Sequence, residues 1–376
     1  MRVDRARGLR AVLGRIGPFA LVGLASLVLT GCGPRGLGPA AFPAEGCRVV
    51  ALRDGRDGAL IGGAEDLVWH RGSGMLLVSA YDRLAVAEAL AAGTVPPSGG
   101  LYGVELAALS SGGAAVARRL IEPDALAGGL RPHGIALAGD RLAVVNRRWF
   151  AGTTLAPVVQ TFRLDGARVR LGSTVGGAAL CAANDLAFVP DGLAVSLDRG
   201  HCPGWSVLER VLGVARARVI ELALPARSAP QVLNAAEHMA TRLTGLALAN
   251  GVARLPNGAL AVAETRAKRV VIDDAGKRRR LRLPGAPDNL TVADDGRLVA
   301  ALSPNLIGFA RYRYGHSPRT GSRVIALDPD TGAIQRLFED PSGQRFPGAT
   351  VAVVVGQSLI AGSVRAQGLL VCEGNR

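Results

Sequence analysis

The sequence predicts an all-β protein, a six-bladed β-propeller closed by its N- and C-terminal strands. A polar residue, a short apolar strand, a turn and a second apolar strand follow one another six times along the chain. The 50 glycines have no Gly-X-Y period, so they exclude collagen and indicate many turns. Cysteines at positions 47 and 372 lie near the two ends of the repeats, where they could close a ring.

Each repeat reads as a hairpin of two buried strands with turn residues between them. The six hairpins are Glu65 to Ser79, His133 to Asn146, Asn184 to Ser196, Asn250 to Glu264, Asp288 to Ala301, and Thr350 to Gly362. The first and last copies, marked by Asp66 and Val351, are 285 residues apart over five intervals, so the mean spacing is 57 residues. This spacing suits a four-stranded blade with insertions. Only one stretch, Trp205–Val214, has helical periodicity, so a two-domain α/β fold is disfavoured.

The first 31 residues are predicted to be a signal peptide. Arginines between positions 2 and 15 precede a short apolar run from Pro18 to Leu29. The run ends in Leu29-Thr30-Gly31-Cys32, which resembles the lipobox of bacterial lipoproteins and implies a lipid on Cys32. An ordinary signal peptide with a chance cysteine is the alternative. We therefore expect a signal at 1–31, a lipidated cysteine and flexible tether at 32–45, and the propeller at 46–376. This places the protein in the bacterial cell envelope, with the membrane as a partner through the lipid.

The other four cysteines allow three disulfide pairings, and export permits disulfides. Pairing Cys47 with Cys372 would close the ring, and closing so long a loop restricts the unfolded chain most. Cys181 and Cys202 would then form the second pair.

The formal net charge of +14 does not indicate a nucleic-acid partner. Of the 44 basic residues only Lys268 and Lys277 are lysine, which is typical of a GC-rich coding bias. Aromatic residues make up only 4% of the chain, which argues against a stacking platform for single-stranded nucleic acid. The basic run Lys277–Arg282 is predicted to be a solvated strand or loop.

A polar residue begins the first strand of every repeat, although strand alternation does not require one. These residues are Glu65-Asp66, His133, Asn184-Asp185, Asn250, Asp288-Asn289 and Thr350. If the six strands converge on one axis, their carboxylate and amide oxygens converge too, and oxygen ligands of this kind suit calcium. Turn formation explains any one of these residues, but it explains the three doublets poorly.

At these positions the chain resembles the paraoxonase, or arylesterase-like, family and more distantly the SMP-30/gluconolactonase-like propellers. The matching segments are Ala64–Leu67, Arg131–Ile135, Asn184-Asp185, Ala249–Gly251, Asp288-Asn289, Gly348–Val351 and the pair Cys47 and Cys372. The resemblance implies a calcium-dependent hydrolase of lactones or aryl esters, with two calcium ions. The catalytic ion would be held by Glu65, Asn184, Asn250, Asp288 and Asn289. The structural ion would be held by Asp66, Asp185 and the Ile135 carbonyl, and His133 would act as the catalytic base.

Two positions depart from the family pattern. Arg147 and Ser303 stand where the family has further histidines, and an arginine cannot act as a base near neutral pH. His201 is a weak candidate for the missing group. The segment Cys202–Gly213 lies where the family has an amphipathic helix, and it could form a lid, contact the membrane or simply pack.

Two other functions stay open. One is a binding or scaffold lipoprotein that keeps calcium only for stability, and the other is a strictosidine-synthase-like propeller without this calcium set. If the protein is an enzyme, we expect its substrate to be a small molecule, an ester or lactone in the case of the hydrolase.

Overall fold

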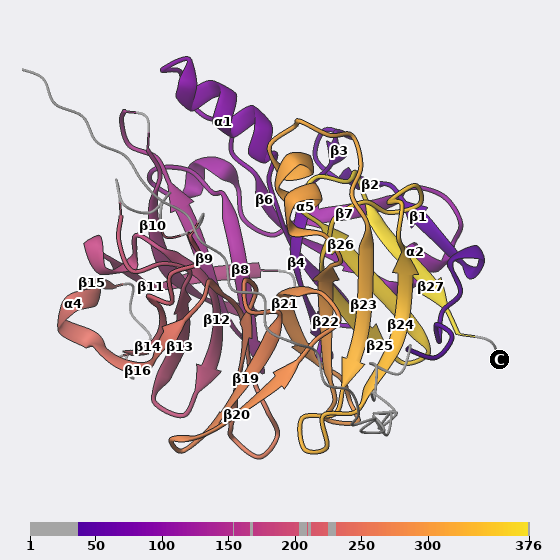
Figure 1. Ribbon diagram of the computed structural model, residues 1–376. Coiled ribbons are helices and arrows are strands. Elements are labelled where there is room, and N and C mark those ends of the chain that lie inside the picture. The colour runs from indigo at the N-terminus through magenta and orange to yellow at the C-terminus, as the bar shows by residue number, and fades with distance from the viewer. Residues whose placement is uncertain are drawn as a thin grey trace, which may run out of the picture. The chain divides into compact units, whose positions relative to one another are not determined.

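Six sheets surround one axis in the part of the chain that the structure describes (Figure 1). This computed structural model describes residues 37–374 except 153, 166–167, 203–208, 210–211 and 225–230. The predicted six-bladed propeller is thus confirmed. The predicted signal peptide and lipidated Cys32 lie outside the described residues.

The strands of each blade follow from the axis outward. Blade 1 consists of β4 (Ala64–His70), β5 (Met75–Ala80), β6 (Gly100–Glu105), β7 (Ala115–Arg119), β2 (Leu52–Asp54) and β3 (Leu60–Ile61). Blade 2 consists of β8 (Pro132–Ala138), β9 (Arg141–Arg148), β10 (Ala156–Asp165), β11 (Arg168–Gly176) and β15 (Gln231–Asn234). Blade 3 consists of β12 (Ala183–Val189), β13 (Gly192–Leu197), β14 (Ala217–Ala223) and β16 (Met239–Leu246).

The second half of the ring is more regular. Blade 4 consists of β17 (Ala249–Arg254), β18 (Leu260–Glu264), β19 (Arg269–Asp274) and β20 (Lys277–Arg282). Blade 5 consists of β21 (Ala286–Val292), β22 (Leu298–Ser303), β23 (Ser322–Leu327) and β24 (Ile334–Asp340). Blade 6 consists of β25 (Ala349–Val355), β26 (Ser358–Ser363), β27 (Leu369–Glu373) and β1 (Cys47–Val50).

The apolar core is divided among the contacts between neighbouring blades. Each hydrophobic cluster joins two adjacent sheets: Leu67 of blade 1 packs in one cluster with Val351 of blade 6, and Leu77 of blade 1 packs in another with Leu142 of blade 2. Because both faces of a blade are covered by its neighbours, the strands near the axis read as continuous apolar runs instead of alternating ones. This is why the hairpins could be recognised in the sequence.

The N- and C-terminal strands close the ring. Strand β1 pairs antiparallel with β27, and the paired residues Cys47 and Cys372 form a disulfide, as predicted. Strand β1 ends at Val50, because Leu52 already belongs to β2 at the outer edge of blade 1. Within the segment predicted as a tether, the amides of Ala41 and Phe42 donate to β24 carbonyls, and the Phe42 side chain is buried.

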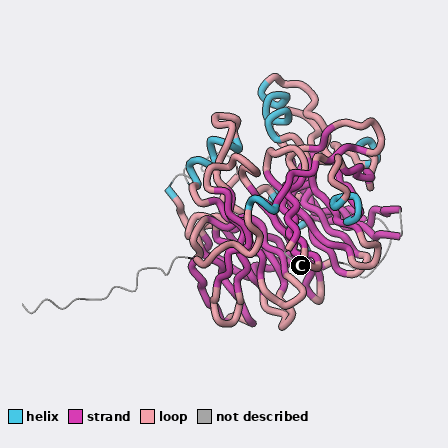
Figure 2. Tube along the Cα trace, turned by 90° about the vertical axis from the view of Figure 1, so that its right-hand side faces the viewer, coloured by secondary structure: helices cyan, strands magenta, loops and turns pink. Residues whose placement is uncertain are grey.

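Short helices connect the strands, and two of them lie at the end of the molecule where the inner strands begin. The 3-10 helix η1 (Ala44–Gly46) precedes β1, and α2 (Leu106–Ser110), η2 (Pro123–Ala125), η3 (Ala178–Leu180) and α4 (Ala235–His238) lie in connections between strands. The two longest, α1 (Arg83–Ala91) and α5 (Leu306–Arg313), stand together at this end in Figure 1, and Figure 2 shows the same end from the side. Neither was expected from the sequence. The stretch that was, Trp205–Val214, falls largely outside the described residues.

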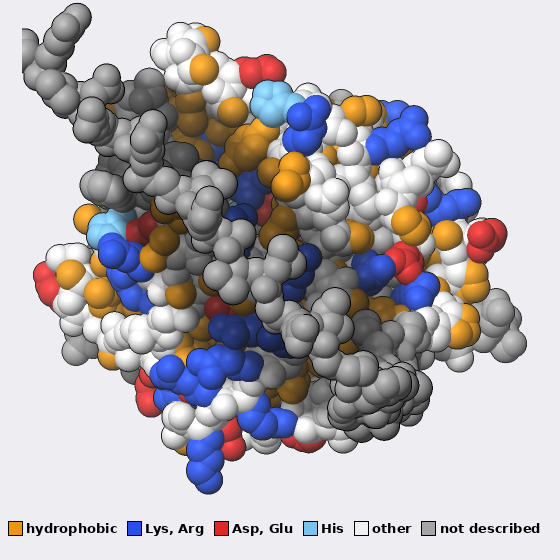
Figure 3. Space-filling view, in the orientation of Figure 1, with side chains coloured by type: hydrophobic (Ala, Val, Ile, Leu, Met, Phe, Trp, Pro, Cys, Tyr) orange, Lys and Arg blue, Asp and Glu red, His pale blue; other side chains and the backbone are white. Residues whose placement is uncertain are grey.

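The basic run Lys277–Arg282 forms β20, the exposed outer strand of blade 4. Figure 3 shows Lys and Arg side chains gathered over this part of the surface. Charged side chains on an edge strand prevent pairing with another sheet edge, so the run has a structural explanation. Among the described residues, no helix has the length and apolarity needed to cross a membrane.

Candidate functional site

All six inner strands are irregular at the same level of the channel. In each one the pairing with its neighbour shifts by a bulge, between Ala64 and Asp66 in β4, for example. The bulged residues are Glu65, His133-Gly134, Asn184-Asp185, Asn250-Gly251, Asp288-Asn289 and Thr350. A bulge leaves two residues opposite one and re-aims a side chain. The polar residues that strand alternation could not explain therefore lie in bulges or directly beside them, and the structure brings the predicted polar site residues to one ring.

The residue that follows the first polar residue of each repeat alternates between acid and glycine around the first four blades. The Asp66 Oδ2 accepts a hydrogen bond from the Ile135 amide at 2.7 Å, and the Asp185 Oδ2 accepts one from the Val252 amide at 2.7 Å. Each acceptor thus lies against the backbone of the next blade. The Ile135 backbone lies beside Asp66, as the prediction requires, although here its amide makes the contact.

Gly134 and Gly251 occupy the second position in blades 2 and 4 because there is no room there for a side chain. A Cβ at Gly134 would lie 2.7 Å from the Asn184 carbonyl oxygen, and a Cβ at Gly251 would lie 2.7 Å from the Asn289 Cα. Only glycine permits so close an approach of two backbones. The His-Gly and Asn-Gly pairs of the repeats therefore have a packing cause.

The first residues of the bulges contact one another from blade to blade around the axis. The Glu65 Oε1 lies 3.1 Å from the His133 Nε2, and the His133 Nδ1 lies 3.0 Å from the Asn184 carbonyl oxygen. A carbonyl can only accept, so Nδ1–H donates to it and the lone pair of a neutral ring lies on Nε2. The Ser79 hydroxyl donates to the His133 carbonyl at 2.6 Å and holds this strand in place.

Blades 4 and 5 contribute amides and a further acid. The Asn250 Nδ2 donates to the Asp288 Oδ1 at 2.6 Å, and the Asn289 Nδ2 donates to the Glu65 carbonyl at 3.0 Å. The Thr350 hydroxyl of blade 6 donates to the same Glu65 carbonyl at 2.9 Å. The ring of first and second residues is thereby connected through all six blades.

Burial dominates the protonation of this ring. Burial, and then the charge of Asp185, raises the pKa of Asp66 well above its ordinary value. Burial raises the pKa of Asp185 to about 7, and burial followed by the charge of Glu65 raises the pKa of Asp288 to about 7. Crowded carboxylates in a dry site resist ionisation for these reasons.

The pKa of His133 is shifted in the opposite direction from the pKa values of the acids. Burial, and then the charges of Arg147, Arg83 and Arg313, holds the pKa of His133 well below its ordinary value. Both causes disfavour the imidazolium ion. The imidazole of His133 is therefore neutral near physiological pH, with its lone pair on Nε2.

The donor set fits a hard cation. Among the described residues of the ring, three buried side-chain oxygens have no hydrogen-bond partner: Oδ1 of Asn184, Oδ1 of Asp185 and Oδ1 of Asn250. Buried polar atoms are nearly always paired, and amide and carboxylate oxygens are the atoms that calcium takes. Glu65 is the exception, because its Oε2 accepts from the Arg83 Nε, and its Oε1 lies 3.1 Å from the His133 Nε2. In the described part of the chain, no three His, Cys, Asp or Glu side chains form a metal cluster by themselves, so amides are needed.

Arg83 is a site residue that the sequence analysis missed. It is the first residue of α1, its Nε donates to the Glu65 Oε2 at 2.6 Å, and its Nη1 donates to the Tyr81 hydroxyl at 2.5 Å. The available signal was Asp82, a helix N-cap directly after the second strand of the first repeat. That position lies at the same end of the blade as the polar ring.

Arg147 and Ser303, the two departures from the family pattern, have different surroundings. The Arg147 Nη2 lies 3.5 Å from the His133 Nδ1 and 3.4 Å from the Ala183 carbonyl oxygen. The Ser303 hydroxyl donates to the Asn305 carbonyl at 3.0 Å. Arg147 is therefore beside the predicted base, and Ser303 is engaged with its own loop.

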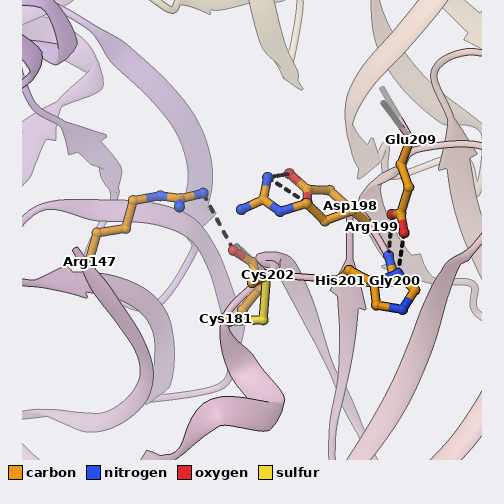
Figure 4. Close-up of a disulfide and its surroundings, with 9 residues drawn as sticks. Arg147, Cys181, Asp198, Arg199, Gly200, His201, Cys202 and Glu209 are labelled. Carbon is orange, nitrogen blue, oxygen red and sulfur yellow. Dashed lines mark hydrogen bonds and ion pairs between the residues drawn. A yellow bond between two sulfur atoms is a disulfide. The ribbon is translucent and has the colours of Figure 1, made fainter. Parts of the chain in front are cut away.

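His201 pairs with Glu209, which is not a residue of the ring. Figure 4 shows it against Glu209, close to the second disulfide, and its side chain is 47% exposed. The disulfide joins Cys181 and Cys202, as predicted. Two disulfides agree with an extracytoplasmic location. Most of the segment predicted as a lid, Cys202–Gly213, lies outside the described residues.

No protein-family profile and no curated protein matches the chain. Among solved structures, it is similar to a gluconolactonase from Xanthomonas campestris, with 18% identity over 91% of this chain and 99% of that one and a TM-score of 0.47. It is also similar to the calcium-binding protein regucalcin from Agrobacterium tumefaciens, with 13% identity, 90% and 96% coverage and a TM-score of 0.49. A periplasmic gluconolactonase from Pseudomonas aeruginosa gives 16% identity, 70% coverage of each chain and a TM-score of 0.43. At these values the paraoxonase resemblance and the role of each residue stay predictions.

Proposed function

We propose that this protein is a calcium-dependent hydrolase of lactones or aryl esters, exported and lipid-anchored through Cys32. The observation that carries the proposal is the set of three unpaired, buried oxygens in a ring of acids and amides on the channel axis. Glu65, Asn184, Asn250, Asp288 and Asn289 would hold one ion. Asp66, Asp185 and the Ile135 carbonyl would hold the second.

The protein's own contribution to the reaction centres on His133. A bound calcium ion would polarise the substrate carbonyl and stabilise the negative charge on its oxygen. The Nε2 lone pair of His133 takes a proton from water as the water oxygen bonds to the carbonyl carbon. The C–O bond to the leaving group then breaks, and His133 returns the proton to the leaving oxygen. The Asn184 carbonyl keeps Nδ1 protonated and so fixes the lone pair on Nε2.

The proposal is tested with the purified protein in calcium or in chelator, on a panel of lactones and on phenyl acetate. Chelation is expected to abolish turnover and to lower the melting temperature, because an ion bound only by the folded state stabilises it. Turnover that chelator does not affect, or none on any substrate, contradicts the proposal. Calcium-dependent melting without turnover would favour the scaffold function.

A substitution separates the site from the fold. Asn250→Ala removes one of the unpaired oxygens and is expected to lower kcat/KM by about 10- to 100-fold, the cost typical of a change around a bound metal. Its calcium-induced rise in melting temperature should shrink as well. The matched control is Asn234→Ala, at the outer edge of blade 2, which should change neither. Wild-type kinetics in Asn250→Ala would remove this residue from the site.

A further inference from the structure

Two arginines near the candidate site form no ion pair among the described residues. Arg147, in β9, lies 3.4 Å from the Ala183 carbonyl and 3.5 Å from the His133 ring, and its buried Nε has no hydrogen-bond partner. Arg313, at the end of α5, has its guanidinium carbon 5.9 Å from the centroid of the Tyr314 ring, and its charge opposes the rise in the pKa of Asp288.

Two other arginines, Arg83 and Arg199, do form ion pairs with carboxylates. Arg83 forms an ion pair with Glu65, and Arg199 forms one with Asp198 at 3.2 Å. The Arg147 Nη2 lies 3.4 Å from the Ala183 carbonyl oxygen, and Figure 4 shows the Asp198 carboxylate paired with Arg199. Asp198 acts on the pKa of Arg147 through its charge, but its ion pair is with Arg199.

An uncompensated guanidinium in this position is costly. Burial lowers the pKa of Arg147 most, the charges of Arg83 and Arg313 act in the same direction, and Tyr81 and Asp198 oppose them. Arg147 is half-buried, and charges removed from water are ordinarily paired, so a bound anion would complete its pairing.

We propose that Arg147, assisted by Arg313, binds a carboxylate carried by the substrate, so that the natural lactone or ester is an anion. The inference rests on the proposed function and specifies its substrate class. A guanidinium presents a rigid fork of donors that matches a carboxylate bidentately. Arg147 contacts the ring of the proposed base at 3.5 Å, so one small molecule can reach both the arginine and the reacting carbonyl. Arg147 would therefore recognise charge at a position where the resembled family has a histidine.

The kinetic test compares two substrates of equal shape, 5-oxotetrahydrofuran-2-carboxylate and its carboxamide. The wild type should prefer the carboxylate in kcat/KM. Arg147→Gln should reduce that preference by about 10- to 100-fold, the worth of a hydrogen bond to a charged group, mainly through KM. The control is Arg148→Gln, whose guanidinium stacks on Phe150 at 4.5 Å and should leave the preference unchanged. An equal preference in the wild type and Arg147→Gln would overturn the inference.

A binding measurement separates the inference from the proposed function. Glutarate, which cannot be hydrolysed, is titrated calorimetrically into the calcium-loaded protein. Its Kd should rise at least about tenfold in Arg147→Gln and stay constant in Arg148→Gln. If no lactone is turned over but this loss is seen, the hydrolase function fails and the anion site stands. No glutarate binding, or equal binding by Arg147→Gln, overturns the site.

Two additions keep the test decisive. If Arg147→Gln does not fold, Arg313→Gln is measured instead, and it should weaken glutarate binding in the same direction. Inorganic phosphate and sulfate are titrated in parallel. Binding of either more tightly than glutarate would overturn the assignment of a carboxylate.

Discussion

At the residue scale, Asp185 shows how a buried acid exchanges stability for ligand binding. One of its oxygens accepts the Val252 amide at 2.7 Å, and the other has no partner. Because burial raises its pKa to about 7, the ionised form is costly in the folded protein without a cation. A residue selected for folding alone would not be an acid here.

Asp185→Asn is therefore expected to stabilise the calcium-free protein and to remove stabilisation by calcium. At pH 8 the folded state carries the unfavourable charge, so the gain should be on the order of 2–4 kcal/mol. As the pH falls from about 7 toward about 4, the native acid becomes protonated before the unfolded one. The advantage of the variant should then disappear. Urea denaturation in chelator at several pH values measures this. A variant less stable than the wild type at pH 8 would contradict the interpretation.

At the element scale, the bulges are what turn six ordinary hairpins into a site. The hairpins themselves were predictable, because their apolar runs and turns are local signals. The bulges were not, since a shift in pairing depends on the partner strand and leaves only polar doublets such as Asn184-Asp185 in the sequence. The residues of the ring could thus be chosen from the sequence, but not the contacts among them.

The helices that complete the site were missed for a related reason. Both α1 and α5 are short, with nine and eight residues, and too few turns exist to establish a period. Their caps, Asp82 and Asn305, each accept two backbone amides and were the readable signal. Arg83 and Arg313 reach the site only through these helices, so tertiary packing decides their roles.

Close packing of the bulges predicts the effect of filling one glycine. In Gly251→Ala the new Cβ would lie 2.7 Å from both the Asn289 Cα and the Asp288 carbonyl oxygen. Such overpacking should cost about 1–3 kcal/mol of unfolding free energy and displace two predicted calcium ligands. Urea denaturation and a calcium titration should both show the change. Gly113→Ala, with no atom within 4 Å of the new Cβ, is the control. Equal effects in the two variants would show that the backbones are not tightly packed.

At the scale of the whole molecule, the fold is a ring whose closure depends on one strand. Five blades are continuous in sequence near the axis, but blade 6 takes its outer strand, β1, from the other end of the chain. The closure was predictable, because the sequence places a cysteine at each end of the repeats. The two strands β2 and β3 added outside blade 1 were not, since they are only three and two residues long.

The ring predicts different costs for the two disulfides. Cys47–Cys372 spans 325 residues, whereas Cys181–Cys202 spans 21. Restriction of the unfolded chain grows with loop length, so Cys47→Ala/Cys372→Ala should lose about 2–5 kcal/mol and Cys181→Ala/Cys202→Ala less. Alanine is chosen because both terminal cysteines are buried, and a serine hydroxyl would add a desolvation cost. Guanidinium denaturation, with and without reductant, measures the difference. If the Cys181–Cys202 variant were the less stable of the two, the terminal disulfide would not be the main lock of the ring.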